Sequence, residues 1–485
     1  MNRHVVQRLL GLLLMVFSLT LLPPVLVGLW YGDGAVMPFL LGFALTLLLG
    51  TVTWLPVRKV QRELRLRDGF LVVVLFWSVL GLFGTLPFLL AEHEPVLPMG
   101  FTDALFESLS GLTTTGATVM VGLDNLPHSI LFYRQQLQWL GGMGIIVLAV
   151  AILPMLGIGG MQLYRAEMPG PMKDAKLTPR ITETAKALWY IYLGLTIACM
   201  LAYRLAGMGW FDAVAHSFST VAIGGFSTYD DSIGHFNEPL VMIVAIVFMF
   251  ISGVNFALHF LVVRTRNWRT YTRDAEFRAY AMSLCMVALI TIVYLHFTHT
   301  FEGHEALLHG VFQVVSIATT TGFTTAEYFA WPGFLPVMLL FTSFIGACAG
   351  STGGGMKVMR MLLLYKQGKR EILRLIHPAA QVPVKLGNKP VPERVIGAVW
   401  GFFALYVAAF AVMLLALMAT GLDQVTAFSA VAACINNLGP GLGDVGANFA
   451  SINAPAKWVL SFAMLLGRLE IFTLLVLLTP SFWRR

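Results

Sequence analysis

Two stretches of the sequence share a pattern that could bind a cation through its backbone. Residues 112–118 read LTTTGAT, and residues 318–324 read ATTTGFT. Three β-branched residues followed by glycine disfavour a helix. Extended Thr-Gly backbone can instead present a row of carbonyl oxygens, which can replace the hydration shell of a monovalent cation. Glycine accepts the positive φ that lets consecutive carbonyls point the same way. The alternative is that these small residues only kink a helix or allow close helix packing.

Other chemistry has little support in the sequence. The histidines form no HExxH spacing, and neither a Ser/His/Asp order nor paired carboxylates indicate an enzyme. The cysteines form no CxxC or Cys/His cluster, so we expect buried small side chains and neither a disulfide nor a zinc site. The four are Cys199, Cys285, Cys348 and Cys434. We therefore expect a protein that is not an enzyme.

A glycine-rich stretch, GACAGSTGGGMK at 346–357, has a spacing similar to that of a phosphate-binding loop. Met356 separates the last glycine from Lys357, however, and no Ser or Thr follows the lysine. No soluble α/β unit surrounds the stretch. We expect no nucleotide and no other cofactor on this chain.

The elements that must position these loops are membrane helices. The chain has 485 residues, of which 57% are hydrophobic and 12% charged, whereas an ordinary soluble domain carries about 25% charge. Apolar runs of about 20 residues, the length that crosses a bilayer, recur along the chain. They lie at 9–30, 36–57, 69–91, 136–160, 185–207, 238–262, 278–299, 332–362, 394–419 and 455–480. We predict an all-α polytopic membrane protein.

Charge predicts how the spans are oriented, because Lys and Arg concentrate in cytoplasmic loops. Basic residues cluster at 57–69, 165–186, 264–278 and 360–394 and at both ends of the chain. The alternating loops, such as 227–239, carry acids and neither Lys nor Arg. Both termini are then cytoplasmic. The carboxylates of an acidic outer face would raise the local concentration of cations there. Three basic residues fall near the outer surface: Arg134, Arg204 and Lys457.

The two TTTG stretches belong to a fourfold internal repeat. Each repeat has a span, a short amphipathic stretch, a glycine loop and a second span. The loops are TTTGAT at Gly116, AIGGFST at Gly225, TTTGFTT at Gly322 and NNLGPGLG at Gly439. The residue 28 positions later is again glycine each time, namely Gly144, Gly253, Gly350 and Gly467. A helix of about 12 residues is about 18 Å long, half a bilayer, so each repeat predicts a re-entrant hairpin, and the four loops can face a common axis.

At these residues the sequence resembles the Trk/Ktr/HKT superfamily of potassium transporters, most closely its bacterial TrkH subunits, over the whole chain. The resemblance implies four units of span, pore helix, filter loop and span around a central pseudo-fourfold pore, as in potassium channels, after an N-terminal pair of spans. We assign residues 1–68 to the extra pair, 69–164 to unit 1, 165–266 to unit 2, 267–380 to unit 3 and 381–485 to unit 4.

The resemblance also implies which residues form the potassium filter, the one metal site expected. They are Thr114, Thr115, Gly116, Ile223, Gly224, Gly225, Thr320, Thr321, Gly322, Asn437, Leu438 and Gly439. Glycine in the first loop is the form associated with preference for potassium over sodium. The fourth loop has no Thr, and Pro440 follows its glycine. The filter is therefore expected to be less symmetric and less sharply selective than that of a fourfold channel.

Two features below the filter are candidate gates. Glycines oppose a regular helix by about 1 kcal/mol each, and the stretch 346–355 has five of them, so we expect an unwound intramembrane loop, as the family has. Its glycines are Gly346, Gly350, Gly353, Gly354 and Gly355. Arg468 lies deep in the last span and should face a cavity or an acidic partner, where it would slow cation passage. The alternatives are close helix packing for the loop, and an ion pair with Glu470 or with another unit for Arg468.

The resemblance predicts potassium uptake through a gated, cation-selective pore in the bacterial inner membrane, driven by the ion gradient or coupled to protons as a symport. It also implies a homodimer and a separate cytoplasmic ring of nucleotide-binding (RCK) subunits, called TrkA. Anionic lipid could contact the basic inner loops, and no nucleic-acid-binding module is present. The alternative is a proton- or sodium-coupled secondary transporter of another small cation or solute, which predicts inverted repeats. The repeats here are parallel.

Overall fold

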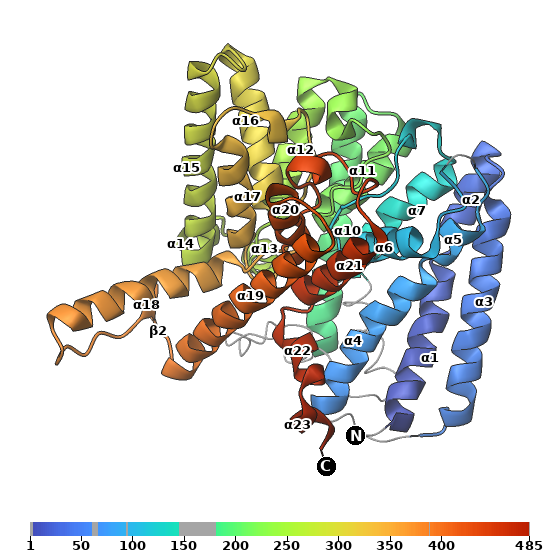
Figure 1. Cartoon of the computed structure of the whole chain (residues 1–485), viewed down its shortest axis with the longest axis horizontal. Helices are drawn as coiled ribbons and strands as arrows, with labels where there is room; N and C mark the ends of the chain where they lie inside the picture. Colours follow the sequence, from blue (N-terminus) through green and yellow to red (C-terminus); the bar gives the residue numbers. More distant parts are fainter. Residues whose placement is uncertain (1–2, 61–65, 94–95, 145–180, 388, 485) are drawn as a thin grey trace.

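The computed structural model describes residues 3–60, 66–93, 96–144, 181–387 and 389–484, and in these ranges the fold is almost wholly helical. The N- and C-termini lie at the same end of the molecule (Figure 1). One short hairpin, β1 (Lys385–Leu386) with β2 (Lys389–Pro390), joins the last two units. The predicted all-α class with several membrane spans is confirmed.

The extra N-terminal pair consists of helices that are long and apolar enough to cross a membrane. It contains α1 (Arg3–Leu19), α2 (Leu22–Tyr31), α3 (Val36–Trp54) and the 3-10 turn η1 (Leu55–Val57). Prolines stand in the first turn of α2, where the missing N–H costs nothing. A Cβ added to Gly11 would lie 2.8 Å from the carbonyl oxygen of Gly50. Glycine at this position therefore lets α1 and α3 pack backbone to backbone.

The first two units follow the predicted order of elements. Unit 1 contains α4 (Leu66–Phe83), α5 (Leu86–Leu90), α6 (Phe101–Leu112), η2 (Leu123–Asn125), α7 (His128–Trp139) and the π-helical η3 (Leu140–Gly144). Unit 2 contains α10 (Ile181–Leu205), α11 (Trp210–Ala222), η4 (Ser232–Phe236), α12 (Pro239–Ser252) and α13 (Phe256–Thr265). The predicted boundary at 164 and the second half of the predicted span 136–160 lie outside the described residues.

The last two units repeat the order. Unit 3 contains α14 (Arg269–Arg273), α15 (Ala275–Phe297), α16 (Gly303–Ala318), η5 (Tyr328–Ala330), α17 (Leu335–Ile345) and α18 (Val358–Ile376). Unit 4 contains α19 (Glu393–Ala419), α20 (Gln424–Ile435), η6 (Gly443–Val445), α21 (Ala454–Arg468), α22 (Phe472–Leu478) and α23 (Pro480–Trp483). Helix α18 and the β hairpin project from the body of the molecule (Figure 1).

The second spans of units 2, 3 and 4 are interrupted, and the interruptions in units 2 and 4 correct the prediction of continuous spans at 238–262 and 455–480. Helices α12 and α13 are bent by 92°, and α21 and α22 by 117°. The second bend follows from positive φ at Glu470 and Ile471, a conformation that a helix cannot contain. Three of the repeated glycines lie at these interruptions: Gly253 caps α12, Gly350 lies in the 346–357 loop and Gly467 is the penultimate residue of α21.

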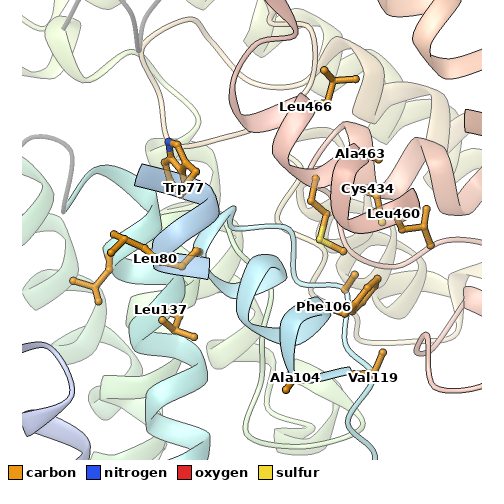
Figure 2. Packing of buried hydrophobic residues seen from close by; sticks show 14 of the residues in the cluster. Trp77, Leu80, Ala104, Phe106, Val119, Leu137, Cys434, Leu460, Ala463 and Leu466 are labelled. Atoms are coloured by element: carbon orange, nitrogen blue, oxygen red, sulfur yellow. The ribbon is translucent and has the colours of Figure 1, made fainter. Parts of the chain in front are cut away.

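The packing closes the last unit onto the first. One cluster of buried side chains extends from the N-terminal pair through unit 1 to unit 4. Figure 2 shows its centre, where Phe106 of α6 lies in the same cluster as Leu460 and Ala463 of α21. The ring of Phe106 also packs 5.5 Å from that of Phe449, centre to centre. The first and the last unit are therefore in contact, as they must be if the four units form a closed ring.

Candidate functional site

The four glycine loops follow the short helices α6, α11, α16 and α20 and meet in one closed ring. A Cβ added to each loop glycine would approach a carbonyl oxygen of the following unit. The distance from the added Cβ to the carbonyl oxygen is 2.1 Å for Gly116 and Gly224 O, and 2.0 Å for Gly225 and Thr321 O. It is 2.1 Å for Gly322 and Leu438 O, and 2.8 Å for Gly439 and Thr115 O. The order is unit 1 to 2, 2 to 3, 3 to 4 and 4 to 1. The predicted filter residues are therefore brought together around one axis.

All four loops share one backbone conformation. The residue before each ring carbonyl has positive φ: Thr114 (54°), Ile223 (55°), Thr320 (69°) and Asn437 (54°). The loop glycine also has positive φ: Gly116 (78°), Gly225 (80°), Gly322 (85°) and Gly439 (101°). The glycines were predicted to adopt it, but the four non-glycine residues were not. Each of these costs about 1–2 kcal/mol, and we attribute their stability to the surrounding packing.

One hydrogen bond repeats in every unit and fixes this conformation. The amide of the residue before the loop glycine donates to a carbonyl in the last turn of the short helix, at 2.8 Å each time. The pairs are Thr115 to Ser110, Gly224 to Ser219, Thr321 to Ser316 and Leu438 to Ala433. Such a bond is typical of helices that end in a left-handed residue. The helix C-termini, which are the negative ends of the helix dipoles, therefore end at the ring.

The threonine hydroxyls of units 1 and 3 divide into two groups. The Thr115 hydroxyl pairs with that of Thr113 at 2.8 Å, and the Thr321 hydroxyl pairs with that of Thr319 at 2.7 Å. These pairs brace the loop. The hydroxyls of the preceding Thr114 and Thr320 instead contact Arg468 and the 346–357 loop, as described below.

The fourth loop uses amides in place of threonine hydroxyls. Asn437 Nδ2 donates to Thr115 Oγ1 at 2.9 Å and to Met464 O at 3.0 Å, so it joins unit 4 to unit 1. The neighbouring Asn436 donates to Ser343 Oγ at 3.0 Å and accepts from the Tyr406 hydroxyl at 2.6 Å. The fourth loop therefore departs from fourfold symmetry in its side-chain hydrogen bonds, while its backbone conformation is the same as in the other loops.

The 346–357 loop separates α17 from α18 and is non-helical, as its glycine content predicts. It lies against the ends of three pore helices. Gly354 N–H donates to Thr320 Oγ1 at 2.7 Å, and Gly355 N–H donates to Asn436 O at 3.0 Å. The Thr352 hydroxyl donates to Val221 O at 2.9 Å. The loop therefore crosses directly beneath the ring, on the side where the pore helices end.

The five predicted gate glycines are needed for this path. Gly346, Gly350 and Gly355 have φ of 69°, 74° and 72°. Gly353 and Gly354 lie close to the ring itself, since an added Cβ would be 2.8 Å from Thr319 O and 2.0 Å from Asn436 O. Side chains at these positions would push the loop away from the ring.

Arg468 ties the ring, the loop and the first unit together. It is the last residue of α21, and its guanidinium donates to Thr114 Oγ1 at 3.1 Å and to Thr352 O at 3.2 Å. The same group donates to Gly142 O at 2.7 Å and to Gly141 O. These acceptors belong to units 1 and 3, while Arg468 belongs to unit 4. The possible partner Glu470 pairs instead with Arg360, so the alternative of an Arg468–Glu470 bridge is not the arrangement found.

Sequence reasoning missed a group of polar residues beside the ring. Arg134, predicted near the outer surface, is only 1% exposed and forms an ion pair with the buried Glu107, with Nε 2.8 Å from Oε1. Its helix α7 also carries Gln135, Gln136 and Gln138, all buried. The signal was in the sequence, because RQQLQ is unusually polar for a membrane span.

Comparisons with known proteins agree with this geometry. A family model described as "TrkH: Cation transport protein" matches residues 35–485. The chain is 56% identical over 485 residues to the Trk system potassium uptake protein TrkH of Halomonas elongata, with 100% of both chains covered. It is 57% identical over 486 residues to that of Escherichia coli, again with 100% of both covered.

A solved structure extends the likeness to three dimensions. The crystal structure of the potassium transporter TrkH from Vibrio parahaemolyticus superposes with a TM-score of 0.91 at 55% identity, and 100% of both chains are covered. A match over nearly the whole chain in both sequence and structure leaves one assignment. The chain belongs to the TrkH family of cation transport proteins.

Proposed function

We propose that this protein takes up potassium through a central, gated pore. The observation that carries the proposal is the closed ring of four loops, in which a carbonyl oxygen from each unit faces the glycine of the previous one. Carbonyl rings can replace the hydration shell of a potassium ion. The names of the relatives, which are potassium uptake proteins, support this ion over other cations.

The proposed filter consists of the backbone around the four loop glycines, with potassium as its cargo and no other metal. The ring carbonyls are those of Thr115, Gly224, Thr321 and Leu438, and each neighbours a left-handed residue and a glycine. Four pore helices ending at the ring add negative potential for the ion. Cations would enter from a face whose loops carry acids and neither Lys nor Arg, such as 227–239.

The proposed gate consists of the 346–357 loop and Arg468. The loop lies across the inner side of the ring, and Arg468 adds a positive charge beside Thr114. A fixed positive charge in the ion path raises the barrier for a cation. Opening requires the loop to exchange its hydrogen bonds with Thr320 and Asn436 for others, which a glycine-rich backbone allows at low strain.

We also propose the setting in which the pore works. The basic loops and both termini would be cytoplasmic and the membrane the bacterial inner membrane, since the chain ends lie at one end of the molecule and basic residues cluster in alternate loops (Figure 1). A TrkA-like ring of nucleotide-binding subunits would dock on the cytoplasmic side and drive the gate. The pore protein would be a homodimer.

Flux measurements on the full-length chain test the proposal. The purified protein is placed in liposomes, and the entry of potassium and of sodium is followed under equal gradients. In parallel, the chain is expressed in cells that lack potassium uptake and grown at limiting potassium. We expect faster potassium than sodium entry, and growth. Liposomes that pass neither ion, together with cells that do not grow, would overturn the proposal.

A further inference from the structure

The second filter loop is held by a side chain from the first unit. Gln138, near the end of α7, donates from Nε2 to the carbonyl oxygen of Gly224 at 2.6 Å. Its Oε1 accepts from the amide of Phe226 at 3.0 Å. One buried amide therefore makes two hydrogen bonds to the backbone on both sides of Gly225. Because both polar atoms are used and water is excluded, its position is fixed on both sides.

Arg134 lies one helical turn earlier on α7 and holds the continuation of the same loop. Its Nη1 donates to Ser227 O at 3.0 Å, and its guanidinium lies 4.3 Å from the centre of the Phe226 ring. Its own place is set by the ion pair with Glu107 of α6. We call Arg134 and Gln138 together the α7 clamp. The clamp connects the pore helix of unit 1 to the filter loop of unit 2.

Gln138 explains why the second loop has glycine at position 224, where the first and third loops have threonine. A Cβ on Gly224 would lie 2.4 Å from Cδ of Gln138. The corresponding residues of the other loops are Thr115, Thr321 and Leu438. The amide of Gln138 therefore occupies the space that a side chain fills in the other three loops.

The repeat register shows that this amide is specific to unit 1. Gln138 is the residue 22 positions after the loop glycine, and the same positions hold Val247 in unit 2, Phe344 in unit 3 and Ser461 in unit 4. Valine and phenylalanine cannot donate a hydrogen bond. The Gly224 carbonyl therefore accepts a hydrogen bond from Gln138, whereas the equivalent residues of units 2 and 3, Val247 and Phe344, cannot donate one.

We propose that Gln138 is a specificity-determining positioning residue, which fixes the Gly224 carbonyl in the ring and so favours potassium over sodium. A carbonyl oxygen has two lone pairs, so one can accept from Gln138 while the other faces the ion. The hydrogen bond prevents this carbonyl from moving inward around a smaller ion. Without the bond the ring can contract, and sodium is discriminated against less. This inference rests on the proposed potassium pore.

The test compares two glutamines of one helix. Gln138→Met keeps the length and volume of the side chain and removes both hydrogen bonds to the loop. Gln136→Met is the matched control, because Gln136 is buried on the same helix but donates to Thr20 O, at 2.7 Å, in the N-terminal pair. Potassium and sodium entry into liposomes are measured for each full-length variant. We expect the potassium-to-sodium ratio to fall roughly fivefold or more in Q138M, since the bond to the Gly224 carbonyl, one of the two lost, is worth about that factor, and to stay at the wild-type value in Q136M.

The outcomes separate the two proposals. If the wild type passes neither ion, the proposed function itself fails. If the wild type prefers potassium and Q138M keeps the same ratio, only the role of Gln138 is overturned. Should Q138M not fold, Gln138→Leu is measured, which also removes the donor to Gly224 O and introduces no ionisable group. An unchanged ratio in Q138L would also overturn the proposal, since the donor is the group on which it depends.

Discussion

Two regions hold the ring of four loops in different ways: the α7 clamp at the side of the ring, and the 346–357 loop below it, where the pore helices end. At the flank, the α7 clamp comes from a regular helix and uses fixed side chains, one of them in a buried ion pair. On the inner side, the 346–357 loop contacts the ring largely through backbone groups and five glycines. Selecting an ion requires a cage that keeps its size, whereas a gate requires an element with two arrangements. Under the proposed function, the fixed side chains would support the filter and the glycine-rich backbone would form the gate.

A substitution in the ring itself should have the largest effect. In Gly225→Ala the new methyl group would lie 2.0 Å from Thr321 O, and alanine at φ of 80° is strained. We expect potassium entry to be lost. Gly439→Ala, where the nearest oxygen is 2.8 Å away, should retain more entry than G225A. Gly194→Ala, in α10 with no atom near the added group, serves as the control. Equal activity of G225A and G194A in liposomes would contradict the ring geometry.

Displacing the 346–357 loop should raise potassium entry, whereas the substitution in the ring lowers it. In Gly354→Ala the methyl group would lie 2.0 Å from Asn436 O, so the loop must move away from the ring. We expect potassium entry without any partner to increase, because the barrier is displaced. The matched control is Gly368→Ala in α18, where the added group meets no atom. Entry at or below the wild-type rate in G354A, with folded protein, would argue against the loop as the gate.

Removing the charge below the ring should have an intermediate effect. Arg468→Gln keeps a donor for Thr114 but removes the positive charge beside the ring. We expect potassium entry to rise roughly tenfold, which corresponds to about 1.4 kcal/mol of barrier. Single-protein current recordings distinguish a larger current from a longer open time. A current equal to that of the wild type would show that the charge does not act on the passing ion.

An ion pair at the outer rim should matter least. Lys457 Nζ lies 2.7 Å from Asp103 Oδ1, and the aspartate side chain is 39% exposed. Lys457 occupies in unit 4 the place of Arg134 in unit 1, 18 positions after the loop glycine. The lysine is buried and only the aspartate reaches solvent. Lys457→Met keeps the volume of the buried side chain and leaves Asp103 hydrated, so it should lower the thermal stability and leave the potassium-to-sodium ratio unchanged. A fall in the ratio like that expected for Q138M would mean that both positions support the filter.

Much of the architecture could be predicted from local patterns. Apolar length indicated the membrane spans, repeated glycines located the four loops, and the glycine-rich stretch 346–357 indicated the interruption in unit 3. The bends at Gly253 and after Arg468 were nevertheless missed. Hydropathy measures only how apolar a segment is, and a bent helix pair of the right length has the same composition as a straight one.

The partners of individual side chains could not be predicted. Thr114 and Asn437 adopt left-handed backbone although neither is glycine, and only the packing of the ring makes this conformation favourable. Arg468 was expected to face a cavity or an acidic partner, and the hydroxyl and carbonyl acceptors from units 1 and 3 were not foreseen. Those residues are more than a hundred positions away along the chain.

Length, hydropathy and the need for positive φ are local properties, so the membrane class, the fourfold repeat and the four loop glycines could be predicted from the sequence. Which unit supports which loop depends on how the units pack. Gln138 reaches Gly224 because α7 of unit 1 packs against unit 2, and a hydrogen bond between units depends on the geometry of the whole ring. The contacts that hold the ring carbonyls therefore cannot be derived from the loop motifs alone.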